Sequence, residues 1–168
     1  MKRFASLVIL SLVMASSASA LQWGVRAGGS TIFKPSPSRW GGNAAIDIPL
    51  SEEYPTSLSA FFEMYKKDGF TTIPTGLSIL YKAPLSRYGG TIYFTGGGGI
   101  LRFSGPDLLT GNNRSSTDGI ITVAGGTWVP VTETIAIYGQ FRWFKRFASG
   151  ALNEYAISFG VHFPVGNE

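Results

Sequence analysis

The chain has 168 residues, of which 14% are charged, 14% are aromatic and 22 are glycine. Its 14 basic and 10 acidic residues give a net charge of +4, which falls to +2 without Lys2 and Arg3. Because no tract of one charge remains, nucleic acid is not an expected partner. The chain contains no cysteine, which excludes disulfide bonds, thiolate metal sites and an acylated N-terminal cysteine.

Residues 1–20 have the three parts of an export signal. Lys2 and Arg3 are basic, the apolar stretch ends at Met14, and Ala18-Ser19-Ala20 offers small residues for cleavage. The apolar stretch is shorter than the ~20 residues that a membrane-spanning helix requires. We therefore expect cleavage after Ala20 and a single mature domain over residues 21–168.

Alternating hydrophobicity predicts about eight strands along the mature chain. In each, one face is apolar and the other is small or polar, as a period of two requires. In chain order the strands lie near 22–28, 40–50, 58–65, 73–82, 88–103, 119–131, 135–143 and 155–163. Within the fifth, Gly96–Gly99 are expected to shift the phase through a bulge.

Four of these stretches end in a similar phrase of an apolar residue, a proline, an apolar residue and a small or polar residue. The prolines are Pro49, Pro84, Pro130 and Pro164. Proline cannot donate to a strand ladder and belongs at strand ends. The repeated phrase therefore predicts hairpins that all turn at one end of an up-and-down barrel.

The connections after these phrases are expected to be short, and those at the opposite end longer. The longer ones are predicted at 34–39, 66–69, 104–118 and 146–153. This asymmetry is typical of outer-membrane barrels, whose termini lie on the periplasmic side. Loop 104–118 is the longest and is the candidate contact for an extracellular partner.

The polar strand faces carry seven charged or amide-bearing candidate residues. They are Arg26, Asp47, Glu63, Lys82, Gln140, Arg142 and His162. An eight-stranded lumen is just wide enough for side chains to fill it, and charges there must pair. We expect both arginines to pair with the two carboxylates and plug the lumen; a small pore is the alternative. Trp128 is a misfit on the same face.

Aromatic residues gather at the predicted strand ends. They are Trp23, Tyr54, Tyr88 and Phe163 at one rim, and Phe33, Trp40, Phe103, Trp143 and Phe144 at the other. Such positions favour aromatic girdles at the two lipid–water interfaces. Core aromatics of a soluble β-domain are the alternative.

The sequence offers no catalytic residue, metal site or cofactor site. His162 is the only histidine, and no nucleophile and acid accompany it in the sequence. Without cysteine, one histidine cannot build a histidine- or thiolate-rich metal site. Gly96–Gly99 lack the lysine and the following helix of a phosphate-binding loop.

The segment 158–165 resembles the C-terminal assembly signal of outer-membrane proteins. Its matching positions are Ser158, Gly160, Phe163 and Val165, although the chain continues to Glu168 instead of ending on an aromatic residue. Together with the export signal and the strands, the chain resembles small OmpA/OmpX-type barrels. The resemblance implies a closed antiparallel eight-stranded transmembrane barrel in the outer membrane of a Gram-negative-type bacterium. It also implies outer-membrane lipid, periplasmic chaperones and the barrel-assembly machinery as partners.

Three hypotheses about function follow. The leading one is a non-enzymatic, integral outer-membrane barrel with a structural, adhesion or envelope-integrity role and a plugged lumen. The second is a soluble periplasmic lipocalin-like barrel, whose apolar faces would point inward around an apolar ligand. The third is a lipid-modifying barrel enzyme, which requires a serine and an acid beside His162.

Overall fold

We describe the protein from a computed structural model. It covers residues 23–36, 38–51, 54–85, 89–106, 112–148, 150 and 153–165. The predicted export signal and Tyr88 lie outside these described residues. Within them, no helix is long and apolar enough to cross a membrane.

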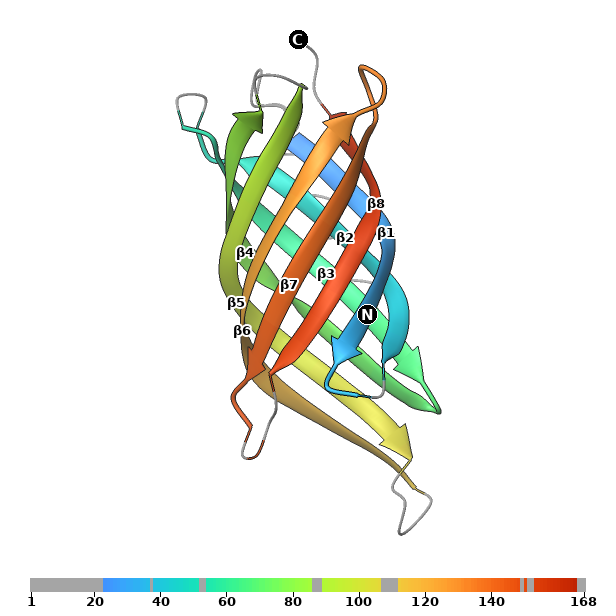
Figure 1. Cartoon of the computed structure of the whole chain (residues 1–168). Coiled ribbons are helices and arrows are strands. Elements are labelled where there is room, and N and C mark those ends of the chain that lie inside the picture. Colours follow the sequence, from blue (N-terminus) through green and yellow to red (C-terminus); the bar gives the residue numbers. More distant parts are fainter. Residues whose placement is uncertain are drawn as a thin grey trace, which may run out of the picture.

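Eight antiparallel strands form one closed barrel in chain order (Figure 1). They are β1 (Trp23–Lys34), β2 (Arg39–Pro49), β3 (Thr56–Lys67), β4 (Phe70–Leu85), β5 (Gly90–Pro106), β6 (Asn113–Pro130), β7 (Ala136–Arg146) and β8 (Glu154–Val165). Pairing of β1 with β8 closes the sheet, so the barrel wall has no open edge. The predicted eight-stranded up-and-down barrel is confirmed.

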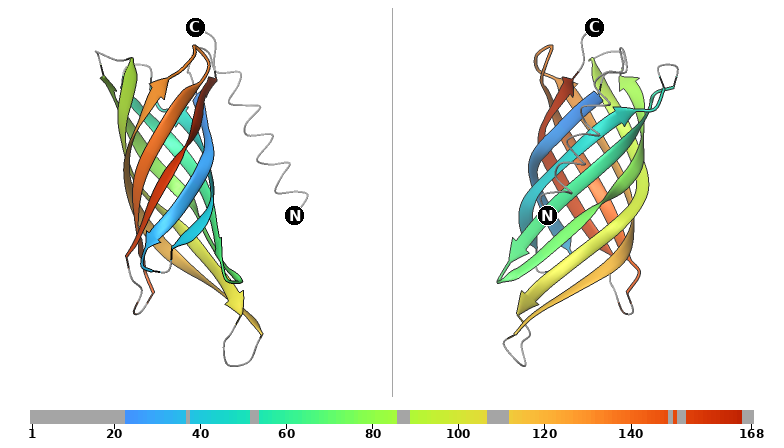
Figure 2. Two further views of the ribbon diagram at one scale, coloured as in Figure 1. Left: turned by 45° about the vertical axis from the view of Figure 1, so that its right-hand side comes forward. Right: turned by 180° about the vertical axis from the view of Figure 1, so that it is seen from behind.

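The two ends of the barrel carry different features (Figures 1 and 2). The C-terminal rim holds the start of β1, the end of β8 and the connection 131–135, and β2 and β4 also end there. The hairpin rim, at the opposite end, holds the connection 68–69 and the ends of β1, β5 and β7. At the hairpin rim, β5 and β6 project beyond the other strands (Figure 2).

The predicted contrast between short and long connections is wrong. Much of predicted loop 104–118 is a paired hairpin, with Ser104 opposite Ser115. Its polar residues predict a loop, but a strand ladder that projects beyond the barrel can carry polar side chains on both faces. The β3–β4 connection is a tight turn in which Asp68 and Gly69 have φ of 50° and 82°, values that suit a two-residue hairpin turn.

The predicted bulge at Gly96–Gly99 is also wrong. Through these residues β5 pairs without interruption with both β4 and β6. A Cβ atom on Gly97 would lie 2.1 Å from the carbonyl oxygen of Leu77. Gly97 and Gly99 therefore permit close approach of the neighbouring β4 backbone, and the alternation of faces is unchanged.

The alternation places an apolar exterior around a mixed interior. Every strand exposes large apolar side chains, for example Phe33, Trp40, Phe62, Leu77, Phe94, Val123, Phe141 and Phe159. The buried side chains include Arg26, Asp47, Glu63 and Arg142. This polarity is the reverse of a soluble barrel, so it disagrees with the lipocalin-like hypothesis, in which the apolar faces point inward.

Two apolar clusters lie inside the barrel. The one toward the hairpin rim contains Ile32, Ala45, Phe61, Tyr65, Leu101, Ile120, Phe144 and Ala156. The one toward the C-terminal rim contains Leu80, Tyr93, Trp128, Ala136 and Tyr138. Phe144 belongs to the first cluster and Phe103 packs against it, so their predicted place in an outer girdle is wrong.

Candidate functional site

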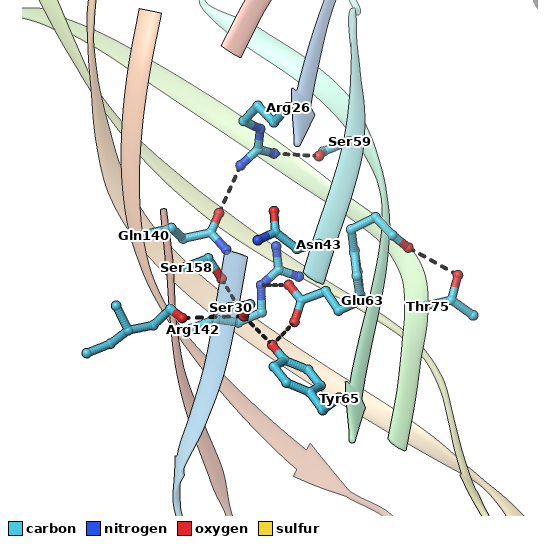
Figure 3. Close-up of polar contacts among 12 residues, drawn as sticks. Arg26, Ser30, Asn43, Ser59, Glu63, Tyr65, Thr75, Gln140, Arg142 and Ser158 are labelled. Carbon is cyan, nitrogen blue, oxygen red and sulfur yellow. Dashed lines mark hydrogen bonds and ion pairs between the residues drawn. The ribbon is translucent and has the colours of Figure 1, made fainter. Parts of the chain in front are cut away.

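The polar interior is organised around Arg26 of β1. Its guanidinium is 2% exposed and binds Asp47 through two contacts, Nε to Oδ2 at 2.8 Å and Nη2 to Oδ1 at 2.9 Å. It also donates to Gln140 Oε1 at 2.8 Å, Ser59 Oγ at 3.0 Å and the Tyr93 hydroxyl at 3.3 Å. Figure 3 shows Arg26 reaching toward Gln140 and Ser59. We call these five residues the central network.

The strand register explains why this network forms. Arg26 lies directly opposite Ala45 of β2, a small residue that leaves room for the guanidinium to cross to Asp47. Asp47 follows Ala45 by two positions and therefore shares its inward face. A planar guanidinium with five donors can then bind partners on several strands at once.

A second network lies nearer the hairpin rim (Figure 3). Arg142 Nε is 3.2 Å from Glu63 Oε1, and the same carboxylate accepts a hydrogen bond from the Tyr65 hydroxyl. The Ser30 hydroxyl links Tyr65, at 2.7 Å, to Ser158, at 2.9 Å. The two predicted arginines therefore each contact one of the two predicted carboxylates, Arg26 on the neighbouring strand and Arg142 across the lumen.

Aromatic rings complete the surroundings of Arg142. Its guanidinium carbon lies 4.4 Å from the Phe61 ring centroid and 5.7 Å from that of Phe144. The contact to Glu63 is an ion pair without hydrogen-bond alignment. Cation–π attraction in this desolvated setting therefore adds to the electrostatic attraction of the carboxylate.

A third network at the hairpin rim was not among the candidates. Arg39 Nη2 lies 3.3 Å from Glu154 Oε2, and Arg39 Nη1 donates to Thr72 Oγ1 at 2.7 Å. Arg146 pairs with Asp118, and its Nη1 lies 3.9 Å from Glu154 Oε1. Continuing the inward alternation by one or two residues past the predicted strand ends would have identified most of these positions.

The remaining two candidates, Lys82 and His162, lie toward the C-terminal rim. The His162 ring stacks on Trp128 with a centroid distance of 4.5 Å and an interplanar angle of 9°. Trp128 also stacks on Tyr93, at 4.8 Å, and Lys82 Nζ lies 5.8 Å from its ring centroid. The misfit Trp128 is thus the centre of an aromatic stack inside the barrel.

The candidate girdle residues lie near the strand ends where they are described. Trp40 is 66% exposed near the hairpin rim, and Phe163 is exposed near the C-terminal rim. Trp23 and Trp143 are partly buried, and Tyr88 lies outside the described residues. Trp23 pairs with Val165, which brings the start of β1 and the end of β8 together.

The candidate assembly-signal residues all belong to β8. Ser158 is buried in the second network, and Gly160 faces Gly28 of β1 so closely that a Cβ would lie 2.1 Å from the carbonyl oxygen of Ala27. Phe163 is exposed on the outer wall. Their role as an assembly signal stays a prediction.

In the part of the chain that is described, no group of three or more His, Cys, Asp or Glu side chains could hold a metal ion. Among the described residues, the His162 ring stacks on Trp128, and no hydrogen bond joins His162 to a serine or a carboxylate. The cluster required by the lipid-modifying hypothesis is therefore not found among these residues.

No family model and no curated protein sequence matches the chain. Neisserial surface protein A is similar in structure, with a TM-score of 0.67 and 15% identity over 86% of this chain and 97% of that one. The N-terminal barrel domain of Pseudomonas aeruginosa OprF has a TM-score of 0.64 and 15% identity over the same shares. The Yersinia pestis attachment invasion locus protein Ail has a TM-score of 0.59 and 11% identity over 86% of this chain and 97% of that one. A structure of Ail with the heparin analogue sucrose octasulfate scores 0.58 at 10% identity, over 86% of this chain and 97% of that one. The chain therefore has the fold of the small eight-stranded outer-membrane barrels.

Proposed function

We propose that the chain is an integral outer-membrane protein of a Gram-negative-type bacterium, exported through residues 1–20. The observation that carries this proposal is the reversed polarity of the barrel. Large apolar side chains are exposed on all eight strands, while ion pairs are buried inside. Exposing such an apolar exterior to water is unfavourable, whereas contact with lipid is not. Closure of the barrel also pairs the backbone donors and acceptors of the strands with one another, as a bilayer requires.

Membrane fractionation tests this location directly. The protein should stay with the membrane through alkaline carbonate extraction, and the unheated sample should migrate differently from the boiled one on a detergent gel. Release into the soluble fraction by carbonate would contradict the proposal. An unshifted band from a soluble fraction would contradict it equally.

In the proposed orientation, the C-terminal rim faces the periplasm and the hairpin rim faces outward. Export places the predicted mature N-terminus in the periplasm, and β1 begins beside the end of β8 at the C-terminal rim. The projecting β5–β6 hairpin then reaches beyond the membrane on the outside (Figure 2). Protease added to whole cells should cut near 107–112 and leave the 131–135 connection intact.

The lumen is proposed to be plugged. This proposal is supported by the central and second networks, which lie in the middle of the barrel, and by an apolar cluster toward each end. An eight-stranded barrel leaves little space beyond that occupied by side chains. In planar bilayers we expect no steady conductance, and regular single-channel steps from the wild-type protein would favour a small pore instead.

The hairpin rim supports an adhesion role without enzymatic activity. Five basic residues are exposed there, namely Lys34, Lys66, Arg102, Arg114 and Lys145. Ail, a neighbour of similar fold, is named for attachment and has been solved with a heparin analogue. We propose that this rim contacts anionic groups on an external partner, and that the β5–β6 hairpin, which contains the predicted loop 104–118, takes part.

Retention on immobilised heparin in detergent tests this role. Arg102→Gln should elute at lower salt than the wild type, because its guanidinium lies on the hairpin's outward face. Lys82→Gln removes the same charge from the barrel interior and should elute like the wild type. Equal elution of all three proteins would remove the support for adhesion and leave a structural or envelope-integrity role.

The assembly partners remain part of the proposal. Phe163 and Val165 close the last strand, and their pattern supports delivery by periplasmic chaperones to the barrel-assembly machinery. Phe163→Ala should slow the appearance of heat-modifiable protein in cells. The exposed Phe159→Ala on the same strand face is the matched control.

A further inference from the structure

A cavity opens inside the barrel at the C-terminal rim. Its volume is about 270 Å³, slightly below the ~300–1,000 Å³ of drug-sized ligand sites and many times the ~10–15 Å³ that one water requires. Its lining includes Lys82, Thr91, Trp128, Thr132, Glu133 and His162. The size and the mixed lining suit a small polar molecule with an apolar part.

Among the described residues that line this cavity, Lys82 is the only lysine or arginine, and no described carboxylate pairs with it. Asp47, the acid of the neighbouring central network, already has both oxygens bound by Arg26, at 2.8 and 2.9 Å. A partly buried ammonium without a counter-ion is costly, and an anion from solution would lower that cost.

The aromatic stack forms a rigid wall beside this ammonium. Trp128 is held between Tyr93 and His162, with ring centroids 4.8 and 4.5 Å away. Gly24 leaves space for His162, since a Cβ there would lie 2.4 Å from the imidazole Nε2. Trp128 and His162 line the cavity and present ring surface to a ligand, while Tyr93 connects the stack to the central network.

Glu133 limits the charge of that ligand. It is exposed in the connection 131–135 and lines the same cavity as Lys82. One cation with an acid near the mouth favours a single negative charge over a dianion. The hydroxyls of Thr91 and Thr132 offer further hydrogen-bond donors to an anionic group.

We propose that this cavity binds a small organic monocarboxylate, with Lys82 contacting the carboxylate and Trp128 contacting the apolar part. The carboxylate belongs either to a free small acid or to the end of a short peptide. This site goes beyond the proposed envelope role, because binding in the cavity is measured in detergent and is independent of membrane location or adhesion.

The test uses the protein purified from membranes in detergent, with the Trp128 indole N–H resonance as the readout. N-acetylalanine should shift this resonance saturably, whereas N-acetylalanine amide should not. Lys82→Gln should weaken the affinity about tenfold or more, as expected for loss of a charged hydrogen bond, and Lys82→Arg should keep most of it. Lys67→Gln, at the last residue of β3 and far from the cavity, is the matched control and should bind normally.

Further arms separate the ligand sources and the effect of folding. Saturable binding of N-acetyl-trialanine would assign the site to peptide ends, and binding of N-acetylalanine alone would assign it to free acids; either supports the proposal. Equal binding of the amide, unchanged affinity in Lys82→Gln, or binding of inorganic phosphate but not the acids would overturn it. If Lys82→Gln no longer shifts on the gel, it has not folded, and Glu133→Gln is measured instead. Tighter binding of N-acetylalanine by Glu133→Gln supports the proposal, and unchanged binding overturns it.

Discussion

Replacing Asp47 with alanine isolates the electrostatic role of the central network. Asp47 and Arg26 are 1% and 2% exposed, and two short contacts join them. Each hydrogen bond to a charged group contributes about 1.5–3 kcal/mol, and breaking a buried ion pair from one side costs about 3–5 kcal/mol. The remaining partners of Arg26 are neutral, so none can replace the lost charge. We therefore expect Asp47→Ala to lower the free energy of unfolding by about 3–5 kcal/mol.

The measurement is reversible urea unfolding in lipid vesicles, followed by tryptophan fluorescence and by the heat-dependent gel shift. Ser59→Ala is the matched control, because it removes one neutral hydrogen bond to the same guanidinium and should cost about 1 kcal/mol. Arg26→Met combined with Asp47→Ala should recover much of the loss, because no unpaired charge then remains buried.

The double-mutant cycle decides whether this reasoning holds. A coupling free energy of about 2 kcal/mol or more between Arg26 and Asp47 is expected for a desolvated pair. If the free-energy losses of Arg26→Met and Asp47→Ala sum to that of the double variant within about 0.5 kcal/mol, the pair behaves like an exposed salt bridge. Water would then have to reach the centre of the lumen, and the plugged interior would be refuted.

Two further predictions concern the wall. Gly97→Ala should lower the free energy of unfolding by about 3 kcal/mol or prevent folding, because its Cβ would meet the Leu77 carbonyl oxygen. A Cβ on Gly96 would have no atom within 4 Å, so Gly96→Ala should show the normal gel shift of the folded protein. Val123→Arg, at a 54% exposed position on the outer wall, should cost about 2–4 kcal/mol in the vesicle assay. Val131→Arg, just beyond the end of β6 at the C-terminal rim, should lower the free energy of unfolding by less than about 1 kcal/mol. An equal loss in Val123→Arg and Val131→Arg would contradict a lipid-facing wall.

The inward and outward faces could be predicted because every strand has large apolar side chains on its outer face. In β8, Tyr155 to Phe163 alternate between large apolar residues and small or polar ones, and the structure has the same faces. Beyond the apolar part of the barrel wall, the alternation between apolar and polar side chains disappears. Residues 113–118 are polar on both faces, so the sequence carries no period of two there although the ladder continues.

The same reasoning explains the missed site residues. Arg39 and Glu154 lie at the first positions of β2 and β8, one residue before Trp40 and Tyr155, at which the predicted strands begin. Gly96–Gly99 carry no side chains, so four residues of regular strand lacked any signal of face. The choice of partner for each arginine depends on strand register, which hydrophobic alternation alone does not determine.

The kinds of cation inside the barrel differ with position in a way that follows from their chemistry. The ion pairs described within the networks use Arg26, Arg39, Arg142 and Arg146. A guanidinium spreads its charge over a plane and binds partners on several strands, so it joins the wall across the lumen. An ammonium is compact and strongly hydrated, which suits a position bordering a cavity open to water. Lys82 occupies such a position, so arginine stabilises the closed interior while lysine lies where that interior can exchange a ligand with solvent.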